Sequence, residues 1–149
     1  MSEEKQIVRA GLRSPPFAVQ AVVLEEDTGL VLSADNTIRN FEEHPVRLMS
    51  DLISYEFPSA GTLVIQEGSP HYLLAVVNDL EQVPHCQKDW VIACLSACFA
   101  FCGEKGITAL ATQILGSVYG NLDPDWFEVE LRIQLAASQV QRVWIMDRD

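Results

Sequence analysis

The chain has 149 residues, a length that suits one domain with its own core, and 48% of them are hydrophobic, which excludes a disordered protein. Its 21 acidic residues outnumber its 10 basic ones, and the net charge of −11 opposes binding to nucleic acid. We therefore expect a single domain over residues 1–149. A small anionic ligand stays compatible with this charge, because backbone N–H groups can bind phosphate without lysine or arginine.

The first half of the chain contains strand-like and helical patterns. Strands are predicted at Phe17–Glu25 and Gly29–Ser33, because both runs are apolar and rich in β-branched residues. The acidic segment Glu26–Thr28 between them is predicted as a turn. A helix is predicted from about His44 to Ser54, where apolar residues recur at helical spacing.

The middle of the chain combines a hairpin with the longest predicted helix. Strands are predicted at Gly61–Gln66 and Tyr72–Val77, and the second is apolar throughout, as in a strand near the sheet centre that is covered on both faces. A helix is predicted over Lys88–Glu104, ending at glycines 103 and 106. Its apolar residues nearly surround it, which indicates deep burial.

The last third alternates strand and helix. Ile107–Thr112 is a predicted strand, and a loop at 115–121 leads to a helix that begins at Asp123-Pro124 and reaches about Ala137. Val143–Met146 is the final predicted strand. This order predicts an α/β fold with a mixed sheet packed between helices.

The termini and cysteines indicate a cytoplasmic protein. The first five residues carry no apolar run, so we expect no export signal, and no stretch is long enough to span a membrane. The cysteines fit reduced thiols on one helix better than a secreted disulfide framework. They are Cys86, Cys94, Cys98 and Cys102.

Several segments resemble the macro domains, a family whose members bind ADP-ribose and related nucleotides and some of which hydrolyse ADP-ribose linkages. Gly61–Ile65 followed by Ser69–Val76 is similar to the family's hairpin. The loop Ile114–Pro124 is similar to its S-T-G-I-Y-G-Y-P pattern, and Val31–Asn36 resembles its I-V-N-A-A-N motif. The resemblance implies a three-layer α/β/α fold of the macro type.

The resemblance also implies a ligand site. Backbone N–H groups of Ser117 and Val118 would bind a diphosphate, Gly120 would permit a tight turn, and Tyr119 would pack against sugar or phosphate. The loop also contains Gly116. Gly116 and Ser117 occupy the two positions at which the family has threonine and glycine.

The segment after the second motif departs from the family. The resemblance makes Asn36 the counterpart of the asparagine that contacts the distal ribose. The glycine-rich loop that should follow is replaced by Thr37–Glu43, which contains no glycine and two glutamates. Without glycine, the backbone of this segment cannot approach phosphate as closely as the family's loop does.

Each sharp interpretation has a structural alternative. The Gly116–Gly120 loop and Asn36 could be ordinary turns, because glycine and asparagine favour turns. The cysteines could form a metal cluster with His85, but buried packing explains them better. Asp123 and Asp125 could be paired catalytic carboxylates, but helix capping explains them better. We therefore predict no metal.

Two functions from different classes follow. The first is a module that binds ADP-ribose or a related nucleotide-derived ligand without strong catalysis or a cofactor. The second is a macro-like scaffold without a ligand site, which associates with protein partners or with itself. Its interface could be anchored by exposed aromatic residues, for which the candidates are Phe41, Phe57, Trp126 and Trp144. We assign no catalytic residue, since no nucleophile motif lies beside a histidine. An enzymatic activity would be ADP-ribosyl hydrolysis.

Overall fold

The structure is a computed structural model that describes residues 5–29 and 58–147. The helix expected at 44–54 lies outside the described residues, as does the strand expected at 29–33 apart from Gly29, which is in a turn. Asn36, Phe41 and Phe57 lie outside them as well. All further structural statements concern the described residues.

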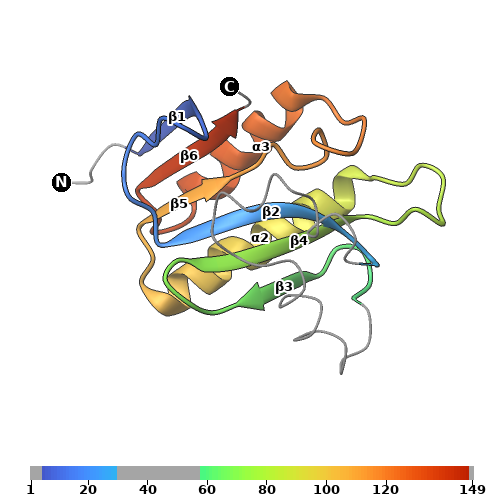
Figure 1. The fold of residues 1–149 in the computed structure, drawn as a ribbon, viewed down its shortest axis with the longest axis horizontal. Helices are drawn as coiled ribbons and strands as arrows, with labels where there is room; N and C mark the ends of the chain where they lie inside the picture. Colours follow the sequence, from blue (N-terminus) through green and yellow to red (C-terminus); the bar gives the residue numbers. More distant parts are fainter. Residues whose placement is uncertain (1–4, 30–57, 148–149) are drawn as a thin grey trace.

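Six strands form one mixed sheet in the order β1-β6-β5-β2-β4-β3 (Figure 1). All neighbouring pairs are parallel except β3 and β4, which form the expected antiparallel hairpin. The interior pair β2 and β5 forms the centre, and β4, whose residues Tyr72–Val77 form the predicted apolar run, lies between β2 and the edge strand β3. The strands are β1 (Gln6–Gly11), β2 (Ala21–Asp27), β3 (Leu63–Gln66), β4 (His71–Asn78), β5 (Ala109–Thr112) and β6 (Arg142–Asp147).

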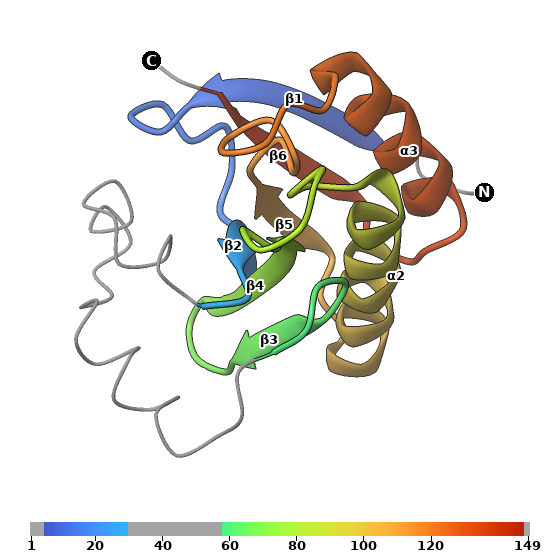
Figure 2. The same ribbon diagram turned by 90° about the vertical axis from the view of Figure 1, so that its right-hand side faces the viewer.

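Both described helices, α2 (Lys88–Lys105) and α3 (Pro124–Ala136), pack on the same face of the sheet (Figure 2). Ala21 and Val23 of β2 face these helices, whereas Val22 and Leu24 point to the opposite face, as strand alternation requires. Neither described helix is long and apolar enough to cross a membrane.

The opposite face of the sheet has its own apolar cluster. Residues of β2, β4, β5 and β6 form it, and the segment before β2 adds Phe17 and Val19. Trp144 belongs to this cluster with only 4% of its surface exposed, and its indole Nε1 donates to the Ala10 carbonyl at 2.9 Å. The suggestion that Trp144 anchors an exposed interface is therefore wrong. Arg142 and Trp144 lie on the same face of β6, and of the two only Arg142 is exposed.

The helix ends follow the sequence signals. Gly106 has φ +68° and its N–H donates to the Cys102 carbonyl, so α2 ends in the left-handed conformation that glycine adopts readily. At α3 the Asp123 side chain accepts from the Asp125 N–H at 2.9 Å, and Pro124 occupies the first turn. Asp123 is thus the helix cap, as the structural interpretation proposed.

Two strand assignments differ from the sequence-based expectation. The strand β1 was not predicted, because it is an edge strand that pairs among the described strands with β6 alone, and none of its residues is fully buried. Glu26 and Asp27 were expected in a turn but belong to β2, where they are 0% and 1% exposed. Charged residues at the end of an apolar run are typical of a turn, and only the three-dimensional surroundings make this segment a buried strand.

All four cysteines are free and buried, and the three on α2 pack in the core against the sheet. Burial raises the pKa of Cys94 to about 12 and that of Cys102 to about 11. Burial, with a smaller contribution from the negative charge of Glu25, raises the pKa of Cys86 to about 12. The pKa of Cys98 is also raised by its complete burial. These thiols are packing residues that stay protonated at neutral pH.

We expect the native protein to resist thiol modification. At about pH 8 an aromatic disulfide reagent should label none of the four cysteines in the folded chain and all of them in guanidinium chloride, because thiolate is the reactive form and is scarce here. The absorbance of the thiolate released from the reagent measures the number of cysteines that have reacted. Rapid labelling of a thiol under native conditions would contradict this result.

Candidate functional site

The carboxyl ends of the central strands meet at one edge of the sheet. The strand β4 leads into residues 79–87 and β5 leads into residues 113–123, and both loops leave the sheet on the right in Figure 1. In α/β sheets with parallel strands, ligands bind at this edge, because loops and helix starts converge there. The loop at residues 113–123 therefore lies at the edge of the sheet where ligands bind in folds of this class.

The strand β2 continues beyond the end of β5. It pairs with β5 only as far as Val23 and Thr112, but with β4 as far as Asp27. Gln113, the residue after β5, adds two hydrogen bonds to β2. Its N–H donates to the Val23 carbonyl at 3.0 Å, and its side-chain oxygen accepts from the Glu25 N–H at 2.7 Å. Glu25 thus stands where loop 113–123 turns over the end of the sheet.

Internal hydrogen bonds fix the shape of this loop. The Ser117 N–H donates to the Ile114 carbonyl at 3.0 Å, and the Leu122 N–H donates to the Gly116 carbonyl at 3.0 Å. The Ser117 hydroxyl donates to the Leu122 carbonyl at 2.7 Å. Gly116 has φ +88°, a conformation that side chains rarely allow. These hydrogen bonds and the backbone angle of Gly116 give the loop one defined conformation.

The two loop glycines have different roles. The positive φ belongs to Gly116, whereas Gly120 is required for space. A Cβ atom on Gly120 would lie 2.6 Å from the Gly116 carbonyl oxygen and 2.8 Å from the Cβ of Cys86. The expectation that Gly120 permits a tight turn holds through this close approach and not through its φ angle.

A buried carboxylate occupies the centre of the loop. Glu25 is 1% exposed, and its Oε1 accepts from the N–H groups of Gly116 at 2.7 Å and Val118 at 3.2 Å. Its Oε2 accepts from the Tyr119 N–H at 3.0 Å and from the Asn78 Nδ2 at 2.9 Å. Burial of a carboxylate is costly unless hydrogen bonds replace its hydration, and these four donors do so.

Neighbouring groups of β2 and β4 complete the site. Asn78 is fully buried, and its Nδ2 lies 3.3 Å from the Glu26 carbonyl oxygen in addition to its bond with Glu25. His85, in the loop after β4, contacts the Tyr119 carbonyl oxygen through Nε2 at 3.2 Å. The two loops therefore support each other over the end of β2.

The predicted site residues from Gly116 to Gly120 lie together in this loop, and Tyr119 is half-buried. Of the two N–H groups assigned to a diphosphate, that of Val118 donates to Glu25 and that of Ser117 to Ile114. Asn36 lies outside the part of the chain that the structure describes.

Sequence reasoning missed Glu25 and Asn78. Glu25 was counted only as the end of a strand, because acidic residues that follow an apolar run are typical of a turn. Asn78 ends an apolar strand with a side-chain donor and gave no local signal. Their partnership spans 53 residues of sequence, so only the fold brings them together.

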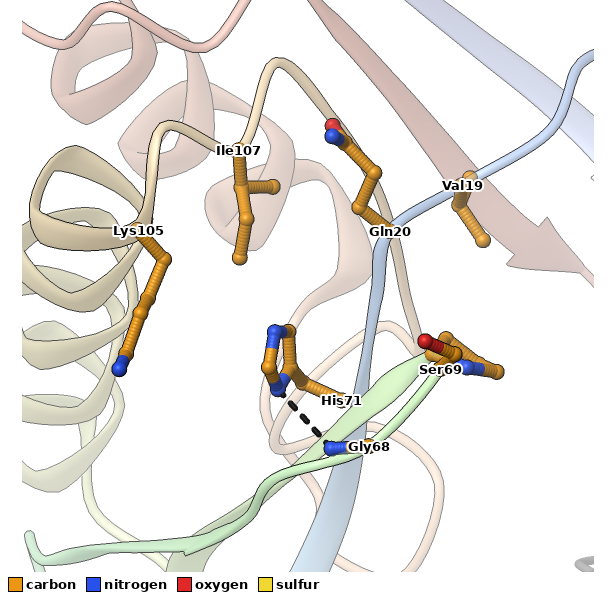
Figure 3. Close-up of a pocket in the computed structure, with 8 residues that line it drawn as sticks. Val19, Gln20, Gly68, Ser69, His71, Lys105 and Ile107 are labelled. Carbon is orange, nitrogen blue, oxygen red and sulfur yellow. Dashed lines mark hydrogen bonds between the residues drawn. The ribbon is translucent and has the colours of Figure 1, made fainter.

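A hollow of about 410 Å³ lies at the opposite, amino-terminal edge of the strands (Figure 3). Two of its polar side chains are already engaged: His71 Nδ1 accepts from the Gly68 N–H at 3.1 Å, and Lys105 forms an ion pair with Glu67 at 2.9 Å. Figure 3 shows the His71 ring between Gln20 and Lys105. We place the candidate site at the carboxyl edge, where several donors converge on one point.

Several solved structures with the same fold are macrodomains. The macrodomain of DarG from Mycobacterium tuberculosis aligns with a TM-score of 0.69 at 17% identity, over 95% of this chain and 97% of that one. The macrodomain of DarG from Thermus aquaticus gives 0.67 at 17% identity over the same shares, 95% and 97%. The Trypanosoma brucei macrodomain in complex with ADP-ribose gives 0.66 at 14% identity, over 94% of this chain and 62% of that one.

No family model matches the sequence, and no curated protein matches it significantly. The likeness is thus carried by the three-dimensional arrangement. The chain has the macrodomain fold, which confirms the fold that the hairpin and loop motifs implied.

Proposed function

We propose that the chain is a macrodomain-type module that binds ADP-ribose or a related nucleotide-derived ligand at the carboxyl edge of its sheet, without strong catalysis. The observation that carries this proposal is the position of the Gly116–Gly120 loop after β5, at the carboxyl edge of the parallel strands, where ligands bind in α/β folds. The N–H groups of Gly116, Val118 and Tyr119 already donate to Glu25, so they are not assigned to the ligand.

The fold adds independent support. The Trypanosoma brucei macrodomain was solved with ADP-ribose, and a macrodomain mutant from Oceanobacillus iheyensis, with 10% identity to this chain and a TM-score of 0.63, was solved with ADPR. In our proposal Tyr119 packs against a sugar of the ligand, the rest of the Gly116–Gly120 loop lines the site, and Asn36 contacts the distal ribose, as the family resemblance implies.

Catalysis is not part of the proposal. Hydrolysis requires a water or hydroxyl held beside the scissile bond by dedicated side chains. The described histidines have structural partners, since His71 accepts from Gly68 and His85 contacts the Tyr119 carbonyl. Neither lies in a recognised nucleophile motif.

Calorimetric titration with ADP-ribose tests the proposal, and Tyr119→Ala sharpens it. Because Tyr119 is half-buried and lies outside both apolar clusters, its truncation should cost about 1 kcal/mol of stability or less. The same change should weaken ADP-ribose binding about tenfold, as expected for loss of an aromatic contact.

The absence of both heat and thermal shift with millimolar ADP-ribose on the parent protein would reject this function. A loss of about 3 kcal/mol of stability on Tyr119→Ala, the size typical of core truncation, together with unchanged affinity, would instead reject the contact between Tyr119 and the ligand.

A second candidate, a scaffold for protein association or homodimerisation, is favoured by a different observation. Val129 and Ile133 lie one turn apart on α3 and are 57% and 60% exposed. Exposed apolar pairs of this kind can contribute to an interface. A monomeric mass by light scattering over a wide concentration range would exclude self-association.

A further inference from the structure

Each oxygen of the Glu25 carboxylate accepts two hydrogen bonds in a cradle built by three elements. Oε1 is bound by the N–H groups of Gly116 and Val118, and Oε2 by those of Tyr119 and the Asn78 side chain. All four donor distances lie between 2.7 and 3.2 Å. This is the donor arrangement of an anion-binding site, and the anion is supplied by the chain itself.

The cradle leaves no place for a second anion. Glu25 is 1% exposed and its neighbours Glu26 and Asp27 are also buried carboxyl residues. A phosphate that used the N–H groups of Val118 and Tyr119 would have to displace Glu25 and leave that carboxylate without its donors. If Glu25 stayed in place, the phosphate would instead lie beside it, and like charges at such distances repel strongly outside bulk water.

We propose that Glu25 is the specificity-determining residue of this site. Its carboxylate fills the anion position of the Gly116–Gly120 loop, so the loop rejects phosphate and the site selects nucleotide-derived ligands through their uncharged nucleoside or sugar portions. The ligand preference rests on the proposed function, whereas the filling of the cradle does not.

The central comparison is between the wild type and Glu25→Ala, which removes the internal anion and leaves the four donors. Formate, a carboxylate small enough for the vacated position, should raise the melting temperature of Glu25→Ala and leave that of the wild type unchanged. ADP-ribose should bind Glu25→Ala about tenfold more tightly than the wild type, because repulsion of its diphosphate is removed. Adenosine, which has no phosphate, should bind both proteins with affinities within about twofold.

Two further substitutions separate charge from shape. Glu25→Gln removes the charge with little change in size and should also increase ADP-ribose affinity. Glu25→Asp keeps a carboxylate and should not. Glu130→Ala is the matched control for carboxylate removal, because Glu130 lies on α3 and accepts from Gln134 at 3.2 Å, away from the loop. It should leave all three ligand responses unchanged.

The outcomes are distinguishable. Equal ADP-ribose affinity of the wild type, Glu25→Ala and Glu25→Gln overturns the proposal, as does tighter binding of ADP-ribose than of adenosine to the wild type. The latter measurement decides the question even where the variants do not fold. If the wild type binds neither compound while Glu25→Ala gains formate and ADP-ribose binding, the role of Glu25 stands and the proposed function fails.

Discussion

Asn78→Asp is expected to lower the free energy of unfolding by about 3–5 kcal/mol, the range found when a buried charge loses its partner. The substitution preserves shape but replaces the Nδ2 donor, 2.9 Å from Glu25 Oε2, with a carboxylate oxygen. Two carboxylates would then face each other in a fully buried position. Guanidinium chloride unfolding followed by circular dichroism measures the loss.

The control is Asn121→Asp, the same chemical change at an exposed position of the loop. It should alter stability by about 0.5 kcal/mol or less. The double variant Asn78→Asp with Glu25→Gln restores one donor and one carboxylate to the pair and should recover part of the loss. Similar stability of Asn78→Asp and Asn121→Asp would show that Asn78 does not support Glu25.

Gly120→Ala is expected to destabilise the fold by about 2–3 kcal/mol through overpacking. The added Cβ would meet the Gly116 carbonyl oxygen at 2.6 Å and the Cys86 Cβ and Sγ at 2.8 Å. The carbonyl cannot move freely, because it accepts the Leu122 N–H that closes the loop. Thermal and denaturant unfolding of the variant measure the effect, which does not depend on any ligand.

Gly68→Ala is the matched control, because Gly68 lies in an exposed turn and a Cβ there would meet only the Pro70 carbonyl oxygen at 3.4 Å. Its stability should stay within about 0.5 kcal/mol of the wild type. Equal stabilities of the two variants would contradict the tight packing of Gly120 against Cys86.

Local sequence signals predicted most of the fold. The ends of α2 and α3 follow from Gly106 and from Asp123-Pro124, because caps act through neighbouring backbone groups. The apolar run of β4 indicated a strand covered on both faces, and this strand is buried almost throughout. Such features are encoded within a few residues, so a sequence pattern can reveal them.

The candidate site was less predictable. Its loop was located from the glycine pattern, but the partner of its N–H groups was not, because Glu25 lies about ninety positions earlier and looks locally like the end of an apolar strand. Gly116 and Gly120 look equivalent in the sequence, yet one supplies a left-handed backbone and the other empty space. Neither distinction has a local sequence signature.

The bonds between Glu25 and the loop also bear on how the domain folds. They join residues 91 to 94 positions apart, so closing them costs chain entropy that only the assembled sheet can offset. The loop can take its shape only after β2 lies between β4 and β5, because Glu25 reaches Asn78 on one side and the loop on the other. Residues 116–119 therefore belong to the same cooperative unit as the central strands, and their opening requires disruption of the sheet rather than the swing of a surface lid.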